Sequence, residues 1–340
     1  MNNKNITAVV LAAGKGTRMQ SSKAKVLHEV LFVPMIHHVL ESLEALKLNR
    51  TVVVTGHQQE NVQAALSNHT VTFANQDKQL GTGHAVLCAE KKIKKTSKTV
   101  LIICGDTPLI QAQTLQNFID THHDCNATLS VMTTHLDNPN NYGRIITDDD
   151  DNIICIVEEK DANESALLIK EINAGIYCVD RSFLFAALKQ VGTDNKQGEL
   201  YLTDIVAIAN RDELTLRRFI CDDAFEVMGV NSRAELSQAH LHLQKRQNNE
   251  LLMNGITLLS PATTAIEKSV HIKNDTTIHP NVHLSGSTRI GSGCTIGRSS
   301  VIKNCTIGEN VTIGPLVYLE GVTIADDEIV PPHQVRCEND

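Results

Sequence analysis

Residues 6–19 read Ile-Thr-Ala-Val-Val-Leu-Ala-Ala-Gly-Lys-Gly-Thr-Arg-Met, a short apolar run that ends in two glycines beside two cations. The run predicts a buried strand over residues 6–12, and the glycines predict a tight turn after it. Glycine lets backbone N–H groups approach an anion closely, and lysine and arginine can neutralise phosphate charge. A phosphate-binding loop and an ordinary strand-to-helix turn both stay open on these residues alone, because Met19 stands where a dinucleotide fingerprint would have its third glycine.

The composition is that of a globular protein and argues against several classes of function. The chain has 340 residues, of which 41% are hydrophobic and 21% charged, with a formal net charge of −8. An acidic chain without clustered positive charge is a poor partner for nucleic acid. The nine cysteines are never spaced as C-x-x-C, which predicts reduced thiols. Because no signal peptide and no apolar run of about 18 residues is found, we expect a cytoplasmic protein without a membrane partner.

Up to about residue 250, short apolar runs alternate with amphipathic stretches, which is the pattern of βαβ units. This predicts an α/β domain with a mixed, mainly parallel sheet. The predicted strands cover residues 6–12, 51–55, 71–74, 99–104, 128–133, 152–157 and 173–179, and predicted helices lie near 35–46, 83–89 and 114–121. The acidic run 148–151 predicts an exposed hairpin tip without a metal, because a turn points consecutive side chains outward.

A six-residue period organises the end of the chain. The aliphatic residues that keep it are Ile266, Ile272, Ile278, Leu284, Ile290, Ile296 and Ile302, then after a one-residue slip Ile307, Ile313 and Leu319, and after another slip Ile324 and Val330. Such a period, with Gly, Ser, Thr and Asn around each aliphatic residue, predicts a solenoid of three-sided β-helix coils. We therefore expect a first domain over residues 1–231, a polar linker helix over 232–254, and a short β-helix with a C-terminal tail over 255–340.

Further blocks follow the first glycine loop in a fixed order. They are Lys25-Val-Leu-His28, Gln76 with Gln79-Leu-Gly-Thr-Gly-His-Ala85, Gly105-Asp-Thr-Pro-Leu109, Tyr142-Gly-Arg144, Val157-Glu158, Glu171-Ile-Asn-Ala-Gly175, Gln197-Gly-Glu199, Tyr201-Leu-Thr-Asp204 and Gly229-Val-Asn231. Together with residues 11–19 they resemble the signature of the sugar-1-phosphate nucleotidyltransferases, most closely the uridyltransferase half of the bacterial N-acetylglucosamine-1-phosphate uridyltransferase/glucosamine-1-phosphate acetyltransferase family. The resemblance covers nearly the whole chain. It implies a Rossmann-like α/β domain followed by a left-handed parallel β-helix of hexapeptide repeats.

The resemblance also implies the reaction and the residues that perform it. UTP and N-acetylglucosamine-1-phosphate would react to give UDP-N-acetylglucosamine and pyrophosphate. The implied catalytic cations are Arg18 and Lys25; the nucleotide-binding residues are Leu11, Ala12, Ala13, Gly14, Gln76, Gly81 and Thr82; and the sugar-binding residues are Gly143, Glu158, Asn173, Tyr201 and Thr203. Asp106 and Asn231 would hold a Mg²⁺ ion, which prefers oxygen ligands. Simpler roles also fit: a helix cap for Asp106, a surface charge for Glu158 and a packed aromatic for Tyr201.

The chain departs from the family pattern at several points. Ala24 stands where proline is usual, Ala174 where threonine is common, and Met228 where an acidic residue precedes the last block. The sequence ends at Asp340 after about four coils, whereas the family's acetyltransferase site lies in later coils, so we expect no acetyltransferase activity. A trimer formed through the β-helix is implied. Two alternatives stay open: the same chemistry on a related amino-sugar phosphate or another nucleoside triphosphate for a dedicated glycan pathway, and a regulatory protein that binds a nucleotide sugar without turnover.

Overall fold

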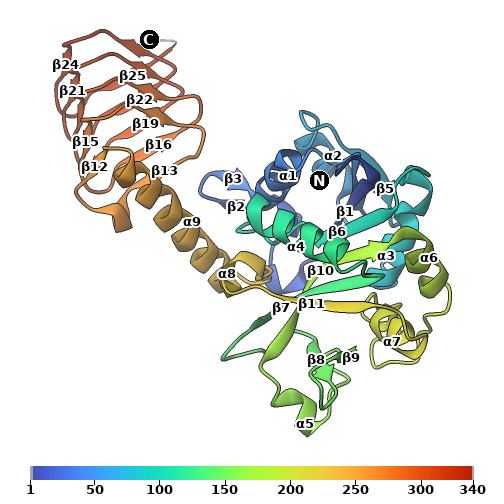
Figure 1. Ribbon diagram of the computed structural model, residues 1–340. Coiled ribbons are helices and arrows are strands. Elements are labelled where there is room, and N and C mark those ends of the chain that lie inside the picture. Colours follow the sequence, from blue (N-terminus) through green and yellow to red (C-terminus); the bar gives the residue numbers. More distant parts are fainter. Residues whose placement is uncertain (1–2, 339–340) are drawn as a thin grey trace. The chain divides into compact units, whose positions relative to one another are not determined.

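The computed structural model describes residues 3–338, and the chain divides into two compact units (Figure 1). The first unit contains the residues up to 28 together with 34–233, and the second contains 29–33 together with the residues from 234 onward. Within the described residues, no helix combines the length and the apolar character that a membrane crossing requires.

A nine-stranded mixed sheet forms the centre of the first unit, in the order β11-β7-β10-β6-β1-β4-β5, with β8 and β9 attached at β10. The strands are β1 (Ile6–Ala12), β4 (Arg50–Thr55), β5 (Thr72–Asn75), β6 (Thr99–Cys104), β7 (Leu129–His135), β8 (Arg144–Thr147), β9 (Ile153–Val157), β10 (Glu171–Asp180) and β11 (Leu216–Ile220). Strand β1 pairs in parallel with β4 and β6, whereas β10 runs antiparallel to β6, β7 and β8. The α/β architecture with a mixed sheet is as predicted.

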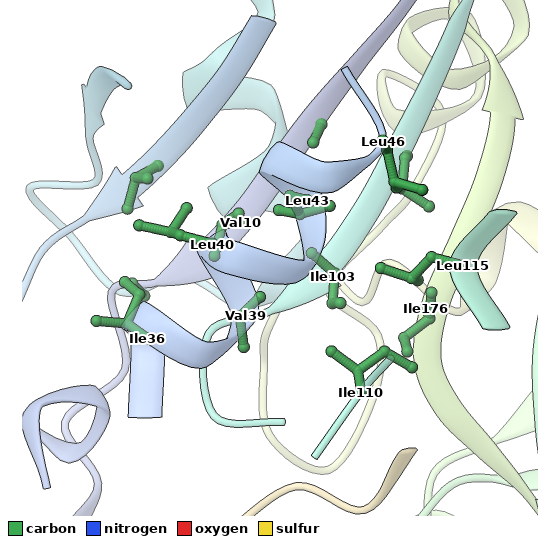
Figure 2. Packing of buried hydrophobic residues seen from close by; sticks show 14 of the residues in the cluster. Val10, Ile36, Val39, Leu40, Leu43, Leu46, Ile103, Ile110, Leu115 and Ile176 are labelled. Carbon is green, nitrogen blue, oxygen red and sulfur yellow. The ribbon is translucent and has the colours of Figure 1, made fainter. Parts of the chain in front are cut away.

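Helices pack on the sheet through two separate hydrophobic clusters. One cluster joins α1 (Met35–Ala45), α2 (Gln59–Ala65) and α4 (Ala112–Asp124) to strand residues such as Val10 and Ile103 (Figure 2). The other joins α3 (Thr82–Ala89), α6 (Arg181–Leu188) and α7 (Asp204–Arg211) to residues such as Val9 and Ile102. Adjacent residues of β1 and of β6 thus enter opposite clusters, as the two-residue period of a strand requires. The remaining short helices are η1 (Asn3–Asn5), η2 (Thr17–Met19), η3 (Lys25–Leu27), η4 (Glu90–Lys92), α5 (Glu164–Leu167) and α8 (Ala224–Val227).

Each of the seven predicted strands is present with its ends shifted by two residues or fewer. Strand β11 and helices α2, α6 and α7 are among the elements absent from the prediction. The reason for β11 is visible in its sequence, because Arg217 and Arg218 interrupt an apolar run at the edge of the sheet. An edge strand needs only one partner, so its sequence carries a weaker signal.

The second unit contains a three-sided parallel β-helix built from strands of two or three residues. One sheet stacks β12 (Thr257–Leu258), β15 (Thr277–Ile278), β18 (Thr295–Ile296), β21 (Thr312–Ile313) and β24 (Ile329–Val330). The second stacks β13 (Ala265–Ile266), β16 (His283–Ser285), β19 (Val301–Lys303), β22 (Tyr318–Glu320) and β25 (Val335–Cys337), and the third stacks β14 (His271–Ile272), β17 (Arg289–Ile290), β20 (Thr306–Ile307) and β23 (Thr323–Ile324). One turn, η5 (Pro261–Thr263), precedes β13. The hexad aliphatic residues form the interior, all of them buried except Ile272, which is partly buried and packs against the others. This confirms the predicted repeat architecture.

The two slips in the six-residue period fall at the same corner of the β-helix. One follows β19 and the other follows β22, which lie side by side in one sheet. Asn304 and Gly321 occupy these shortened corners with φ of 54° and 71°, and the Gly321 N–H donates to the carbonyl of Lys303 at 3.0 Å. Because the shortened corners stack, the strands beyond them stay in register.

The compact units divide the chain at other residues than the expected domains, and the expected division stays a prediction. Helix α9 (Arg233–Met253) was expected to be a separate linker, but all of it beyond Arg233 belongs to the same compact unit as the β-helix. Its polar residues explain why, since the Asn248 amide donates to the carbonyls of Pro261 and Thr264 at 2.7 and 2.8 Å. A helix attached through amide groups has no apolar stripe for sequence analysis to detect.

Residues 29–33 were expected in the first domain and are grouped with the second unit. They form the end of the hairpin made by β2 (Glu29–Val30) and β3 (Val33–Pro34). The Leu31 N–H donates to His240 Nδ1 at 3.2 Å, and the Phe32 ring meets the His283 ring edge-on, with the centroids 6.1 Å apart. These long-range contacts carry no local sequence signal.

Removal of an interior side chain should destabilise the β-helix specifically. Ile296 is 0% exposed, so Ile296→Ala should lower the free energy of unfolding by about 2–5 kcal/mol through lost burial and a cavity. Thr295→Ala changes the neighbouring, partly exposed residue of the same strand and serves as the control. Urea unfolding followed by circular dichroism checks this, and equal midpoints for the two variants would contradict the interior placement of Ile296.

Candidate active site

A cavity of about 410 Å³ opens where the first strand of the sheet ends. Its lining residues are Leu11, Ala12, Ala13, Gly14, Lys15, Lys25, Val26, Gln76, Gln79, Gly81, Thr82, Ala85, Cys104, Asp106 and Glu199. The carboxyl ends of parallel strands share one edge, which is where α/β sheets bind ligands. The structure thus brings together at this edge all seven residues predicted to bind the nucleotide.

The glycine loop after β1 is shaped by the lysine that follows it. Gly16 has φ of 60°, and a Cβ there would lie 2.7 Å from the Cβ of Lys25, so a larger residue would push the Lys25 stem away. Gly14 has no neighbour within 4 Å of a Cβ position and is exposed. The loop therefore holds Lys25 closely at one glycine and leaves open space beside the other.

Lys25 lies against two oxygen groups from distant parts of the chain. Its ammonium pairs with the Asp106 carboxylate and donates to Asn231 Oδ1 at 2.9 Å. The Lys25 and Asp106 side chains are 18% and 10% exposed. The backbone ties the two oxygen groups together, because the Val230 N–H donates to the Asp106 carbonyl at 2.8 Å. This arrangement is a charge-balanced cluster that is largely removed from water.

The same two oxygen groups fit a divalent metal ion. A carboxylate and an amide oxygen that already converge on one cation are suited to Mg²⁺, which commonly binds one or two protein oxygens and takes its other ligands from phosphates and water. Among residues 3–338, no group of three or more His, Cys, Asp or Glu residues is placed to hold a metal. Asp106 and Asn231 are therefore the pair that fits the predicted metal.

Two residues that the sequence analysis singled out, Arg18 and Ala24, do not line the first cavity. Arg18, on η2, is exposed and does not line the cavity, so the structure does not bring it together with Lys25. Ala24 has φ of −54°, within the range of proline. Its N–H donates to Gln58 Oε1 at 3.1 Å, and the Gln58 amide also contacts the Ser22 carbonyl. The Gln58 side chain thus holds the backbone at the position where proline is usual.

Gln76 follows β5 and points its side-chain amide into a network. It is only 3% exposed, and its Nε2 lies 3.0 Å from both the Gly81 carbonyl and His84 Nδ1. Gly81 has φ of 106°, and a Cβ there would lie 2.5 Å from the Leu200 carbonyl oxygen. Only glycine fits this turn, which carries the chain from the Gln76 segment into α3.

A second cavity of about 370 Å³ has an acidic lining and contains predicted sugar-binding residues. Its lining residues are Ile156, Val157, Glu158, Asp161, Gly192, Asp194, Asn195, Tyr201 and Asp204. Burial raises the pKa of the Glu158 carboxyl, while a hydrogen bond donated by Thr203 at 3.1 Å partly offsets that effect. A desolvated carboxyl group in a cavity is typical of a functional site.

The other predicted sugar-binding residues surround Glu158. A Cβ at Gly143 would lie 3.5 Å from Glu158 Oε2, and the Asn173 N–H donates to the Gly143 carbonyl at 2.9 Å. The Tyr201 hydroxyl donates to Asp161 at 3.1 Å, and burial is the main reason that its pKa rises to about 12. The predicted set is therefore one cluster, built from β8, β9, β10 and the start of α7.

Comparison with known proteins agrees with both parts of this structure. Residues 7–225 match the family described as nucleotidyl transferase, and residues 269–304 match the bacterial transferase hexapeptide family with six repeats. The chain belongs to the nucleotidyl transferase family. Members of this family generally use a divalent metal ion, in keeping with the oxygen pair of Asp106 and Asn231.

Curated relatives of this nucleotidyltransferase include several named bifunctional protein GlmU. The relative from Desulfotalea psychrophila is 45% identical over 329 residues, which cover 97% of each chain. Those from Geobacter metallireducens and Exiguobacterium sibiricum are 47% and 46% identical over 88% and 87% of this chain, but only 63% and 66% of their own lengths are matched. The chain therefore spans somewhat less than two thirds of the length of these two relatives.

The fold of the nucleotidyltransferase domain also occurs in a solved structure. A protein described as a glucose-1-phosphate thymidylyltransferase from Bacillus anthracis, crystallised with sucrose, matches with a TM-score of 0.57. The match covers 69% of this chain and 94% of that one at 20% identity. At this identity the likeness shows a shared fold.

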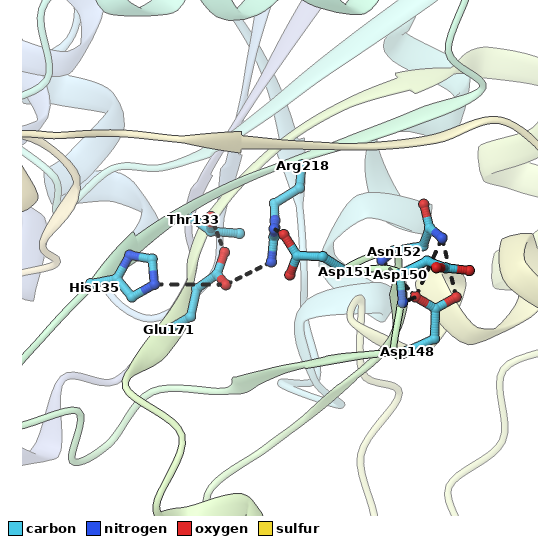
Figure 3. A network of polar contacts seen from close by, with 8 residues as sticks. All are labelled: Thr133, His135, Asp148, Asp150, Asp151, Asn152, Glu171 and Arg218. Atoms are coloured by element: carbon cyan, nitrogen blue, oxygen red, sulfur yellow. Dashed lines mark hydrogen bonds and ion pairs between the residues drawn. The ribbon is translucent and has the colours of Figure 1, made fainter.

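The structure shows a charged tether behind the second cavity that sequence analysis did not detect. Arg218 on β11 donates to Glu171 at 2.8 Å and pairs with Asp151 at the tip of the β8–β9 hairpin (Figure 3). Thr133 also donates to Glu171, at 2.7 Å, and His135 lies 3.9 Å from it. The acidic tip is exposed as predicted, but Asp151 joins it to the central sheet. The same hairpin leads into Gly143 and Glu158, so the tether positions one wall of the cavity.

Several lining residues were not predicted as site residues. They include Lys15, Gln79, Cys104 and Glu199 in the first cavity and Asp161, Asp194 and Asp204 in the second. Most fall inside or next to the sequence blocks that carry the family resemblance, so these blocks could have identified them as site residues. His84, which contacts Gln76, also lies in such a block and had no assigned role.

Neutralisation of Asp151 should loosen the hairpin while the sheet stays intact. Asp151 is 71% exposed, and Asp151→Asn keeps a residue that tolerates its left-handed φ of 64°. Amide hydrogen exchange over residues 144–157 should become about threefold to tenfold faster, because an ion pair becomes a weaker contact between a charged and a neutral group. Asp149→Asn makes the same charge change at the same tip and should leave exchange unaltered. Equal exchange in the two variants would argue against the tether.

Substitution of Gly81 should weaken nucleotide binding without unfolding the domain. Gly81→Ala places a Cβ against the backbone of Leu200 in a conformation that disfavours any L side chain. We expect a loss of UTP affinity of at least about tenfold, measured by calorimetry, since a misplaced binding group alone can cost that much. Gly192→Ala, whose nearest neighbour lies 4.0 Å away, is the control. Unchanged UTP affinity in Gly81→Ala would remove this loop from the nucleotide site.

Proposed function

We propose that this nucleotidyltransferase is a uridylyltransferase that converts UTP and N-acetylglucosamine-1-phosphate into UDP-N-acetylglucosamine and pyrophosphate. The observation that carries the proposal is the placement of Lys25 and Asp106, with Asn231 bonded to Lys25, in the same cavity as Gln76. The cluster supplies the charge chemistry of phosphoryl transfer, and the amide supplies groups that read a base. The GlmU names of the relatives support the choice of substrates.

The base would be recognised by a donor and an acceptor close together in the chain. With both Gln76 N–H groups directed to Gly81 and His84, its Oε1 is the group left to accept a hydrogen bond. Uracil presents the N3–H donor beside the O4 acceptor. We assign N3–H to Gln76 Oε1 and O4 to the Gly81 N–H. Cytosine presents the reverse order at these two atoms, so this pair of groups disfavours it.

The phosphates would lie at the cationic end of the cavity. An oxygen of the sugar phosphate attacks the α-phosphorus of UTP, a new P–O bond forms, and the bond to the β-phosphate oxygen breaks as pyrophosphate leaves. Lys25 and Arg18 would offset the charge on the phosphate oxygens. A Mg²⁺ ion held by Asp106 and Asn231 would supply further charge neutralisation. Positioning and electrostatics suffice, so no covalent enzyme intermediate is needed.

The sugar would occupy the second, acidic cavity. Glu158, Asn173 and Thr203 offer hydrogen-bonding groups that suit hydroxyls and an N-acetyl group, while Asp161 and Asp204 disfavour a second anion there. The phosphate of the sugar is thereby directed toward Lys25 in the first cavity. The β-helix would join three such chains into a trimer, since its outer surface exposes Leu316, Ile329 and Val335, and the protein would act in the cytoplasm.

Pyrophosphate release with Mg²⁺ tests the proposal across UTP, dTTP, CTP, GTP and ATP, each with N-acetylglucosamine-1-phosphate or glucosamine-1-phosphate. We expect release with UTP and the N-acetylated sugar, and a fall in kcat of about 100-fold or more in Asp106→Asn, because a group that neutralises transition-state charge is lost. Asp124→Asn, an exposed carboxylate on α4, is the control. Pyrophosphate release with a different pair of substrates would change the substrate assignment but not the type of reaction. No release with any pair, together with intact ligand binding, would favour a regulatory protein.

A further inference from the structure

We propose that His84 fixes the orientation of the Gln76 amide and thereby sets the preference for uracil over cytosine. The inference rests on the proposed function, because it concerns how the uridylyltransferase selects its base. His84 would act as a positioning residue, since its contact is with Gln76 and it is absent from the cavity lining.

The chemistry of the neighbouring carbonyl decides which end of the amide faces which way. The Gly81 carbonyl oxygen lies 3.0 Å from the Gln76 side chain and can only accept a hydrogen bond. The amide nitrogen must therefore face it. The second N–H of the same nitrogen reaches His84 Nδ1 at 3.0 Å, so His84 must accept there. Both donors of Gln76 are then used, and the acceptor oxygen is left for a ligand.

This contact defines the protonation state of the histidine ring. A ring that accepts at Nδ1 is neutral and carries its proton on Nε2. Nε2 lies 3.9 Å from Cys88 Sγ, one helical turn further along α3, where the sulfur can act as a weak acceptor. Burial raises the pKa of the Cys88 thiol, which favours its neutral form. The ring is thus held between an amide donor and a sulfur acceptor.

Hydrogen bonds hold the backbone of Gln76 in place, so the rotation to consider is a flip of its side-chain amide. Its backbone N–H donates to the Thr55 carbonyl at 2.7 Å, and its backbone carbonyl accepts from the Gln79 amide at 3.2 Å. A flip would turn Oε1 toward both the Gly81 carbonyl and the lone pair of His84 Nδ1. Two hydrogen bonds would become two repulsive contacts.

The orientation has a direct consequence for base choice. With Oε1 toward the ligand, Gln76 accepts from the N3–H of uracil but meets the lone pair at N3 of cytosine. With the flipped amide, Nε2 would donate to cytosine N3 and oppose the N3–H of uracil. Without an acceptor at residue 84, Gly81 alone would resist the flip, so discrimination between the two bases should weaken.

The test compares two substitutions of His84 that differ in the acceptor. His84→Leu removes it at similar size, whereas His84→Asn offers Oδ1 near the position of Nδ1. We expect the ratio of kcat/KM for UTP over CTP to fall about fivefold to tenfold in His84→Leu, mainly through KM for UTP, as loss of one neutral hydrogen bond implies. His84→Asn should stay within about twofold of the parent. His123→Leu makes the same change on α4, away from both cavities, and is the matched control.

A measurement on the parent protein separates this inference from the proposed function. Long-range ¹⁵N–¹H spectra, with the His84 signals assigned by their absence in His84→Asn, should show a proton on Nε2 and none on Nδ1. A proton on Nδ1 would overturn the inference without any substrate. If the parent prefers UTP but His84→Leu keeps both the ratio and KM, or if His84→Asn falls as far as His84→Leu, His84 has no such role. If the parent protein does not react with UTP although Nδ1 is unprotonated, the proposed function is wrong and the orientation of the amide is not.

Discussion

The parallel pairing of β1 with β4 and β6 is the constraint on which the rest of the first unit depends. The pairing places Leu11 opposite Val54 on one side and Cys104 on the other, so three chain segments leave the sheet at one edge. Backbone bonds then continue the alignment beyond the strands, from the Gly105 N–H to the Leu11 carbonyl at 2.9 Å and from the Gln76 N–H to the Thr55 carbonyl. The groups proposed to bind the base and those proposed to bind the phosphates are thus held by the same hydrogen-bonded edge.

The cluster at that edge follows from the cost of an isolated buried charge. A carboxylate that is mostly removed from water requires a cation or several donors, and Lys25 meets that need for Asp106 in this structure. A metal ion at Asp106 and Asn231 would meet the same need with the same oxygens. Lys25 would then pair with phosphate, so the same residues can balance charge within the protein or on a ligand.

Local sequence patterns located most of the elements that were predicted correctly. Apolar runs located the strands, the hexad period located the β-helix, and the glycine loop located the edge of the sheet where Lys25 lies. What the sequence did not reveal depends on contacts between distant residues. The Arg218 tether joins three separate strands, the contact of residues 29–33 with His240 spans about two hundred residues, and the direction of the Gln76 amide depends on a carbonyl whose position requires the left-handed turn at Gly81. Arg18 is the opposite case: the loop motif marked it as a site residue, but it does not line the cavity.

The electrostatic difference between the two cavities provides an orientation for the proposed substrates. The first cavity carries Lys15 and Lys25 together with Asp106 and Glu199, so its charges balance. The second is lined by Glu158, Asp161, Asp194 and Asp204 and by no cation. A sugar phosphate has one anionic end and one neutral, hydroxyl-rich end. In the reverse orientation its phosphate would face four carboxyl groups, and the raised pKa of Glu158 already shows that burial and neighbouring carboxylates oppose further negative charge there. The orientation that places the phosphate near Lys25 is also the one that reaction at the α-phosphorus requires, so the charge pattern of the domain and the proposed chemistry agree.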